Sequence, residues 1–220
     1  MRYFPAFLDL KGRICVVVGG GRVAQRKVLS LRKAGASVKV ISPELTPLLA
    51  RLKEAGKIIH RPHFFRAGDL RGAFLAVAAT DDRATNERVF RQASLQKILV
   101  NVVDAPPWSN FIVPSMVARG ELLVAVSTSG KSPALAKWLR QKIQQEISPE
   151  YAAFLKFLGV VRQKVLSLHF DPQRIQKIFR RLIREDVLSL LRKKDYPGLK
   201  NRLRMILGPE FPLEDLRFGR

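Results

Sequence analysis

Residues 14–27, ICVVVGGGRVAQRK, decide the fold of this chain. The first five, Ile14–Val18, are apolar and mostly β-branched without polar alternation, which is typical of a parallel strand covered on both faces. The following GGGRVA fits the pattern G-x-G-x-x-(G/A), in which glycines let the backbone turn sharply and approach a ligand. A helix beginning at about Arg22 would point its free N–H groups at that turn. The stretch therefore predicts a pyrophosphate site centred on Gly19 and Gly21.

Strand and helix patterns alternate along residues 13–103, with short connections between them. Beyond the first strand, apolar runs predict strands at 37–41, 58–60, 75–79 and 98–103, and helical spacing recurs between them. Such alternation is typical of an α/β protein with a Rossmann-type, doubly wound parallel sheet and right-handed crossovers.

The residues after the second strand bear on which nucleotide would bind. In nucleotide-binding units of this kind an acidic residue usually ends that strand and contacts the ribose. Here Ser42, Pro43 and Glu44 follow the strand, so the acid stands later than expected, and no arginine occupies position 42 or 43 to bind a 2′-phosphate. The pattern favours NAD over NADP. Alternatively, Glu44 is only a first-turn acid of the next helix.

Polar residues also follow the fourth and fifth strands, at the sheet edge where ligands bind in open α/β folds. Thr80 follows the fourth strand, where we expect it to contact the cofactor, and Asp104 is the first acid after the fifth strand, which itself carries Asn101. A carboxylate at that edge can accept or relay a proton beside a cofactor. The alternative is that Asp104, which shortly precedes two prolines, is a turn former.

Beyond the sheet, extended runs at 111–117 and 122–127 predict a β-hairpin that turns through residues 118–121. A polar loop containing Thr128, Ser129 and Lys131 follows, and it leads into a helix with Ser132 as its cap and Pro133 as its first residue. Hydroxyl groups and a lysine at a helix N-terminus suit a carboxylate or phosphate, so we expect this loop to bind substrate together with Asn101.

From residue 151 onward the apolar residues have helical spacing, and no strand pattern occurs. We therefore expect three parts: a nucleotide-binding domain at 1–110, a hairpin and helix at 111–149, and a small all-α domain at 150–220.

The 220-residue chain is strongly basic, with 40 Lys and Arg against 18 Asp and Glu and a formal charge of +22. Such an excess attracts polyanions, although it is also consistent with a solvated basic surface. Both the sheet region and the tail are basic, which argues against a dedicated tail for nucleic acid. The chain has no long apolar run and no signal-peptide pattern, so we expect a cytoplasmic protein without a membrane partner.

Few residues could bind a metal or form a disulfide. The single cysteine, Cys15, falls inside the first strand and is expected to be a core residue. His60 and His63 lie close together, but no third ligand lies nearby in sequence. We interpret them as surface or edge histidines and predict no metal site.

Five segments in series resemble the precorrin-2 dehydrogenase family of sirohaem biosynthesis, which includes the amino-terminal module of sirohaem synthase. The resemblance covers residues 4–147. Its segments are VVVGGGRVAQRK from Val16, AATDD at 78–82, NVVDAP at 101–106, FIVPS at 111–115 and VAVSTSGKSP at 124–133.

The resemblance implies NAD-dependent oxidation of precorrin-2 to sirohydrochlorin and, in some members, insertion of ferrous iron. It implies that Asp104 is the general acid/base, and that the cofactor contacts Arg22, Val23, Pro43 and Glu44. It also implies a homodimer in which the region 111–147 is mainly interface. A competing hypothesis is an NAD-sensing regulatory domain in which Asp104 does no chemistry.

Overall fold

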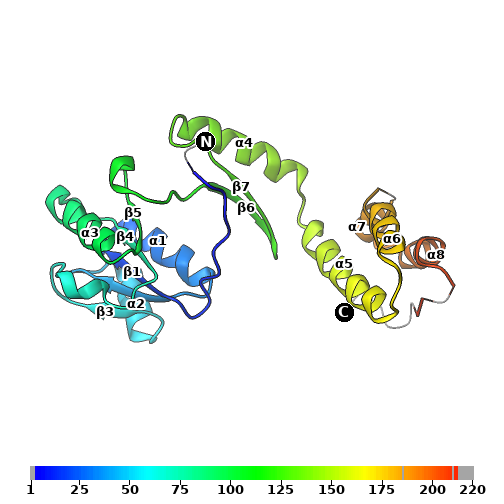
Figure 1. The fold of residues 1–220 in the computed structure, drawn as a ribbon, viewed down its shortest axis with the longest axis horizontal. Coiled ribbons are helices and arrows are strands. Elements are labelled where there is room, and N and C mark those ends of the chain that lie inside the picture. The colour runs from blue at the N-terminus through cyan, green and yellow to red at the C-terminus, as the bar shows by residue number, and fades with distance from the viewer. Residues whose placement is uncertain (1–2, 185, 210, 213–220) are drawn as a thin grey trace. The chain divides into compact units, whose positions relative to one another are not determined.

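The computed structural model describes residues 3–184, 186–209 and 211–212, and the chain forms two compact units (Figure 1). The first unit comprises Met1–Val113 with Ser129–Lys131, and the second comprises Pro114–Thr128 with Ser132–Arg220. The three-part division at 1–110, 111–149 and 150–220 stays a prediction, and its last residues, 213–220, lie outside the described residues.

A parallel five-stranded sheet organises the first unit, in the order β3-β2-β1-β4-β5. The order reverses between β1 and β4, which creates a topological switch point at the carboxyl ends of these two strands. The predicted Rossmann-type fold is confirmed. The strands are β1 (Ile14–Val18), β2 (Ser37–Ile41), β3 (Ile59–Arg61), β4 (Leu75–Ala78) and β5 (Leu99–Val102).

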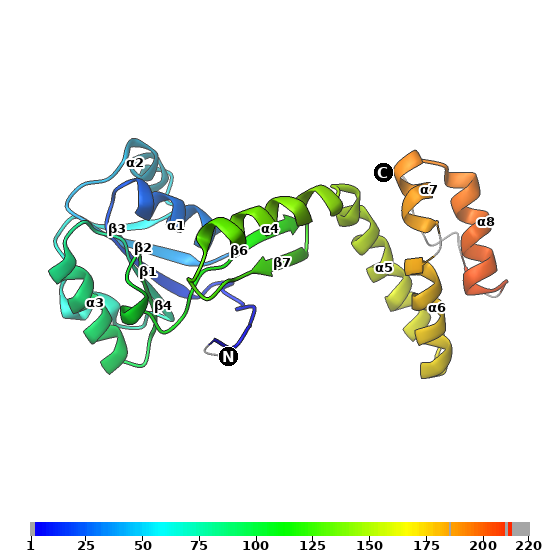
Figure 2. The same ribbon diagram turned by 90° about the horizontal axis from the view of Figure 1, so that it is seen from above.

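Helices cover both faces of this sheet, and alternate residues of β1 pack against the helices on each face. Cys15 and Val17 pack with residues of α1 (Arg22–Lys33) and α2 (Pro47–Glu54), while Val16 packs with residues of α3 (Arg83–Leu95). Figure 2 shows α1 and α2 on one side of the sheet and α3 on the other. This explains why β1 is apolar at consecutive positions. Two short 3₁₀ helices, η1 (Ala67–Leu70) and η2 (Pro106–Trp108), complete the unit.

Cys15 is a core residue, as expected, with no exposed surface. Burial raises the pKa of its thiol to about 11. Because the thiolate is the reactive form, this cysteine is inert in the native fold.

The second unit begins with a β-hairpin of β6 (Ser115–Arg119) and β7 (Leu122–Val126), followed by α4 (Pro133–Glu146). The Ser132 hydroxyl caps α4 by accepting a hydrogen bond from the amide of Leu135 at 3.2 Å, as predicted. The prediction that the first strand starts at residue 111 was wrong, because residues 111–114 do not pair. The predicted turn was too long, since Arg119 already pairs with Leu122.

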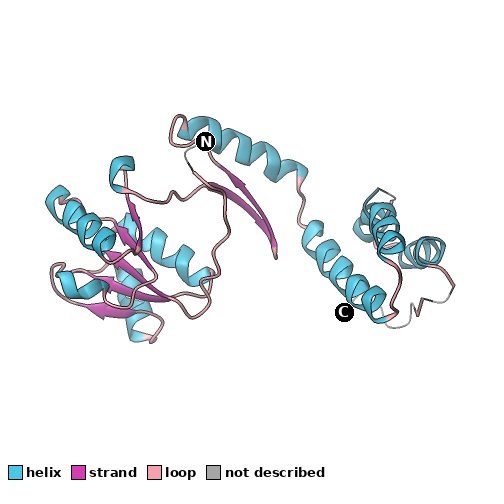
Figure 3. Cartoon of the chain, in the orientation of Figure 1, coloured by secondary structure: helices cyan, strands magenta, loops and turns pink. Residues whose placement is uncertain are grey.

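Four further helices follow in the second unit, and Figure 3 shows that no strand occurs among the described residues after the hairpin. A separate apolar core of residues such as Val161, Leu182 and Leu203 holds these helices together. None of the described helices is long and apolar enough to cross a membrane. The helices are α5 (Glu150–Ser167), α6 (Pro172–Arg184), α7 (Val187–Lys193) and α8 (Tyr196–Leu207).

Candidate active site

The carboxyl ends of β1, β2 and β4 border a cavity of about 800 Å³. This volume is within the range of small-molecule sites, and the cavity lies at the topological switch point. The seven residues predicted to bind the cofactor all line it: Gly19, Gly21, Arg22, Val23, Pro43, Glu44 and Thr80.

The three glycines of the loop after β1 have different structural roles. Gly19 has a φ of +120°, and a Cβ there would overlap the backbone carbonyl oxygen of Ala79. At Gly20 a Cβ would overlap the carbonyl oxygen of Glu44. At Gly21, by contrast, a Cβ would meet no atom of the described residues within 4 Å. Gly19 and Gly20 therefore permit close backbone packing, while Gly21 borders open space in the cavity.

The N-terminus of α1 opens onto this space. Gly21 is its N-cap, so no side chain at that position bonds to the first-turn amides, and the first turn contains no acidic residue. The first helical hydrogen bond runs from the amide of Gln25 to the Gly21 carbonyl at 2.9 Å. The N–H groups ahead of it and the positive end of the helix dipole suit a pyrophosphate. The residues present thus fit a dinucleotide.

The loop between β2 and α2 is fastened to the glycine loop by Thr46. Its amide donates to the Gly20 carbonyl at 3.0 Å, and its hydroxyl donates to Oε1 of Gln25 at 2.6 Å. The same hydroxyl caps α2, which starts at Pro47. The alternative that Glu44 is a first-turn acid of this helix is therefore wrong. Thr46 was not among the predicted site residues, although a threonine directly before a proline is a typical helix start.

Asn86 holds the loop between β4 and α3. Its side-chain amide donates to the Thr80 carbonyl at 2.8 Å, and its Oδ1 accepts from the Thr80 hydroxyl at 2.9 Å. Asp82 caps α3 by accepting from the amides of Ala84 and Thr85, and hydrogen bonding from Thr85 lowers the pKa of the Asp82 carboxyl. Asn86 was also missed, because a polar residue within a helical pattern normally faces solvent.

A second cavity, of about 560 Å³, lies at the carboxyl end of β5. Asp104 lines it, and Asp81 lines both this cavity and the larger one. Asp104 is exposed and has a φ of +57°, a left-handed conformation that aspartate tolerates better than most residues. The sheet thus places Asp104 next to the cavity that holds the predicted cofactor residues.

Lys27 of α1 interacts electrostatically with Asp104. Burial lowers the pKa of Lys27, the positive charge of Arg26 lowers it further, and the negative charge of Asp104 opposes both effects. No sequence motif identifies Lys27 as a partner of Asp104.

Asn101 and Thr128, which are predicted to bind substrate, form hydrogen bonds to backbone groups nearby in the chain. The side-chain amide of Asn101 donates to the Phe111 carbonyl at 3.2 Å. The Thr128 hydroxyl accepts from the amide of Ser132 at 3.1 Å and donates to its carbonyl at 3.0 Å. Ser129 has a φ of +53°, and both Ser129 and Lys131 are exposed. A role in substrate binding stays a prediction for all four.

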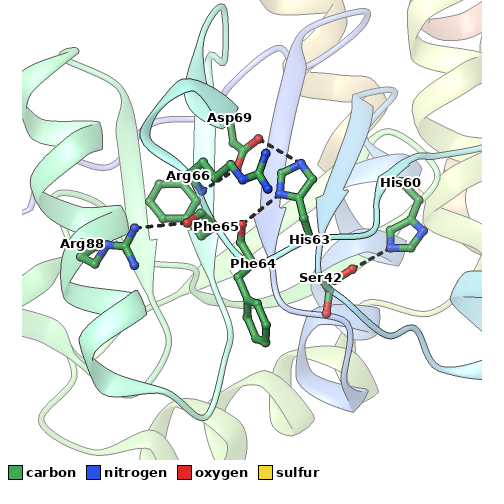
Figure 4. A network of polar contacts seen from close by, with 8 residues as sticks. All are labelled: Ser42, His60, His63, Phe64, Phe65, Arg66, Asp69 and Arg88. Atoms are coloured by element: carbon green, nitrogen blue, oxygen red, sulfur yellow. Dashed lines mark hydrogen bonds and ion pairs between the residues drawn. The ribbon is translucent and has the colours of Figure 1, made fainter.

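The two neighbouring histidines bond to backbone carbonyls (Figure 4). Nε2 of His60 lies 2.8 Å from the Ser42 oxygen, and Nδ1 of His63 lies 2.9 Å from the Phe64 oxygen. Nε2 of His63 is also 3.7 Å from Oδ1 of Asp69. Within the described part of the chain, no three His, Cys, Asp or Glu residues are grouped as metal ligands.

Comparison with known families agrees with this geometry. Residues 6–115, which include the whole sheet, match the NAD(P)-binding family model NAD_binding_7. The chain belongs to this family. Residues 119–146, in the hairpin and α4, match a second model, described as the central part of a sirohaem biosynthesis protein.

Relatives of this NAD(P)-binding chain are siroheme synthases. One from Methylobacillus flagellatus is 46% identical over 86% of this chain and 41% of its own length. Another, from Actinobacillus succinogenes, is 37% identical over 96% of this chain and 44% of its own length. The chain thus spans less than half the length of these relatives. A solved structure, that of SirC, a precorrin-2 dehydrogenase, superimposes with a TM-score of 0.77 at 26% identity, covering 93% of this chain and 99% of that one.

Proposed function

We propose that this chain is an NAD-dependent dehydrogenase that oxidises precorrin-2 to sirohydrochlorin. The observation that carries the proposal is the adjacency of two cavities, which share Asp81: one contains the glycine loop and the other contains Asp104. The likeness to siroheme synthases and to SirC supports the choice of substrate.

In this proposal the protein binds the dinucleotide, orients the substrate and removes a proton. The amides that follow Val18 would hold the pyrophosphate of NAD, and the cofactor, when bound, would supply hydride-accepting chemistry for the oxidation of precorrin-2. Asp104 accepts the proton that the substrate loses, a task that a carboxylate lining the cavity can perform. Precorrin-2 carries acetate and propionate arms, so the formal charge of +22 would attract it, and this attraction should weaken as salt increases.

NAD is the proposed cofactor in preference to NADP. Pro43 and Glu44 line the cavity at the end of β2, where the adenosine ribose binds in Rossmann folds. A carboxylate at this place favours ribose hydroxyls and repels a 2′-phosphate.

An anaerobic assay tests this function. Purified protein is mixed with precorrin-2 and either NAD or NADP, and absorbance of the reduced nicotinamide is followed; ferrous salt is then added to follow metal insertion. We expect reduction of NAD, at a higher kcat/KM than that of NADP. NAD binding without turnover would instead support a regulatory domain that senses NAD.

We further propose that the active form is a homodimer and that the hairpin forms its interface. Met116 and Leu123 lie on one face of the hairpin because Met116 pairs with Ala125 and Leu123 with Ala118. Their side chains are 49% and 40% exposed, whereas Val117 on the opposite face is buried. An apolar sheet face of this kind is typical of an interaction surface.

The double variant Met116→Lys/Leu123→Lys is expected to convert the dimer into a monomer, because it places two charges in the apolar interface. Light scattering coupled to gel filtration would show wild type at twice the 24.9 kDa chain mass and the variant at the chain mass. Leu95→Lys, at an apolar residue that is 77% exposed at the end of α3, is the control and should remain dimeric. A monomeric wild type, or a dimeric double variant, contradicts this interface.

A further inference from the structure

An exposed aromatic ring lies on one wall of the larger cavity. This wall, on the β3 side, is the one farthest from Asp104 along the sheet. Phe64, in the loop after β3, lines this cavity, yet its side chain is 79% exposed. A phenylalanine this exposed at a cavity rim leaves a large apolar surface in water, which a stacked ligand would cover.

The loop that carries Phe64 is fixed by its neighbours. Phe65 is 4% exposed and packs in the core under the guanidinium of Arg88, which lies 5.9 Å from the ring centre and donates to the Phe65 carbonyl at 3.3 Å. On the other side, Nδ1 of His63 bonds to the Phe64 carbonyl. One residue further, the amide of Arg66 donates to Asp69 at 2.7 Å.

Figure 4 shows the Phe64 ring pointing away from the contacts that hold its backbone. These hydrogen bonds involve backbone atoms of the loop, and none of them involves the Phe64 ring. The ring is therefore presented on a fixed backbone, which lowers the entropy cost of stacking a ligand on it.

Sheet order gives the direction in which a dinucleotide must lie. The order β3-β2-β1-β4-β5 places the glycine loop after the central strand, Asp104 after one edge strand and Phe64 after the other. The two edge strands are four spacings apart, about 19 Å at about 4.8 Å per spacing. With the pyrophosphate at the centre and the nicotinamide near Asp104, the adenine must extend towards β3.

We propose that Phe64 is the stacking platform for the adenine ring of the cofactor and is therefore a positioning residue for the reaction. The proposal rests on the function proposed above, in which the nicotinamide lies beside Asp104. Phe64 fixes the adenine end, so it determines affinity and places the nicotinamide without touching it.

Titration of Phe64→Ala with adenine-containing and adenine-free probes tests the proposal. Base stacking on an aromatic ring contributes enough that its loss should raise the Kd for NAD and ADP-ribose about tenfold or more. The affinity for nicotinamide mononucleotide, measured by competition, should be unchanged. Phe64→Tyr should restore NAD affinity because it keeps the aromatic face.

One control variant and the wild-type protein separate this inference from the proposed function. Phe4→Ala removes another exposed phenylalanine, 86% exposed and outside the cavity lining, and it should bind NAD as wild type does. Failure of the wild-type protein to bind NAD would overturn the function and this inference together. Normal NAD binding by Phe64→Ala, or an equal loss of nicotinamide mononucleotide binding, would overturn the inference alone.

Discussion

Asp104→Asn is expected to lower kcat for precorrin-2 oxidation by about 10²- to 10⁴-fold, the usual contribution of a general acid or base. Asparagine has nearly the same shape as aspartate and tolerates the left-handed backbone found at this position, so the turn after β5 should keep its conformation. The amide cannot accept the proton that the substrate must lose. The substitution should therefore lower kcat and leave the Kd of NAD unchanged.

The measurements that check this prediction are kcat from anaerobic NADH formation and the Kd of NAD from calorimetry. Glu54→Gln, which removes an exposed carboxylate outside both cavity linings, is the matched control and should leave both values unchanged. A variant at position 104 that turns over normally would show that Asp104 is only a turn former. A variant that no longer binds NAD would place Asp104 in the binding site and remove the argument for its catalytic role.

Gly21→Ala is expected to fold normally and to bind NAD about 10- to 100-fold more weakly, a loss of roughly 1.4–2.8 kcal/mol. Gly21 has a φ of −79°, which any residue adopts, and its added Cβ would enter open space in the cavity. In the proposed complex that space lies beside the pyrophosphate, so the methyl group should keep the phosphates from the helix N-terminus. Calorimetry measures the Kd of NAD, and thermal unfolding shows separately whether the variant folds normally.

Two other glycines serve as comparisons. Gly68→Ala adds a Cβ that also meets open space, but away from the cavity, and it should change neither Tm nor Kd. Gly19→Ala should lower Tm, because the added Cβ would overlap a backbone carbonyl and the positive φ strains any other residue. If Gly21→Ala binds NAD with wild-type affinity, the pyrophosphate does not lie on this loop.

The sequence predicts the centre of the sheet well because β1 and β4 are apolar at consecutive positions and buried on both faces. Cys15, Val16 and Val17 are buried by helices from both sides, and such a run has few other stable environments. The hairpin was placed less accurately, since residues 111–114 are apolar and yet do not pair. An apolar run does not reveal whether a partner strand is present.

Some residues of the candidate site could be predicted from the sequence, and others could not. Gly19, Gly21 and Glu44 belong to short motifs, so the sequence alone suggested them. Asn86 was missed although its partner Thr80 is only six residues away, and Phe64 was missed because only the fold places the loop after β3 at the cavity. Periodicity assigns Asn86 to a solvated helix face and gives no reason to expect an exposed phenylalanine at the cavity.

A crystal structure of the NAD complex tests the central claim most directly. We predict the pyrophosphate on the amides that follow Val18, the adenine ring on Phe64 and the nicotinamide ring beside the Asp104 carboxylate. A dinucleotide lying the other way round, with its nicotinamide towards β3, or a nucleotide bound outside the glycine loop, would contradict it.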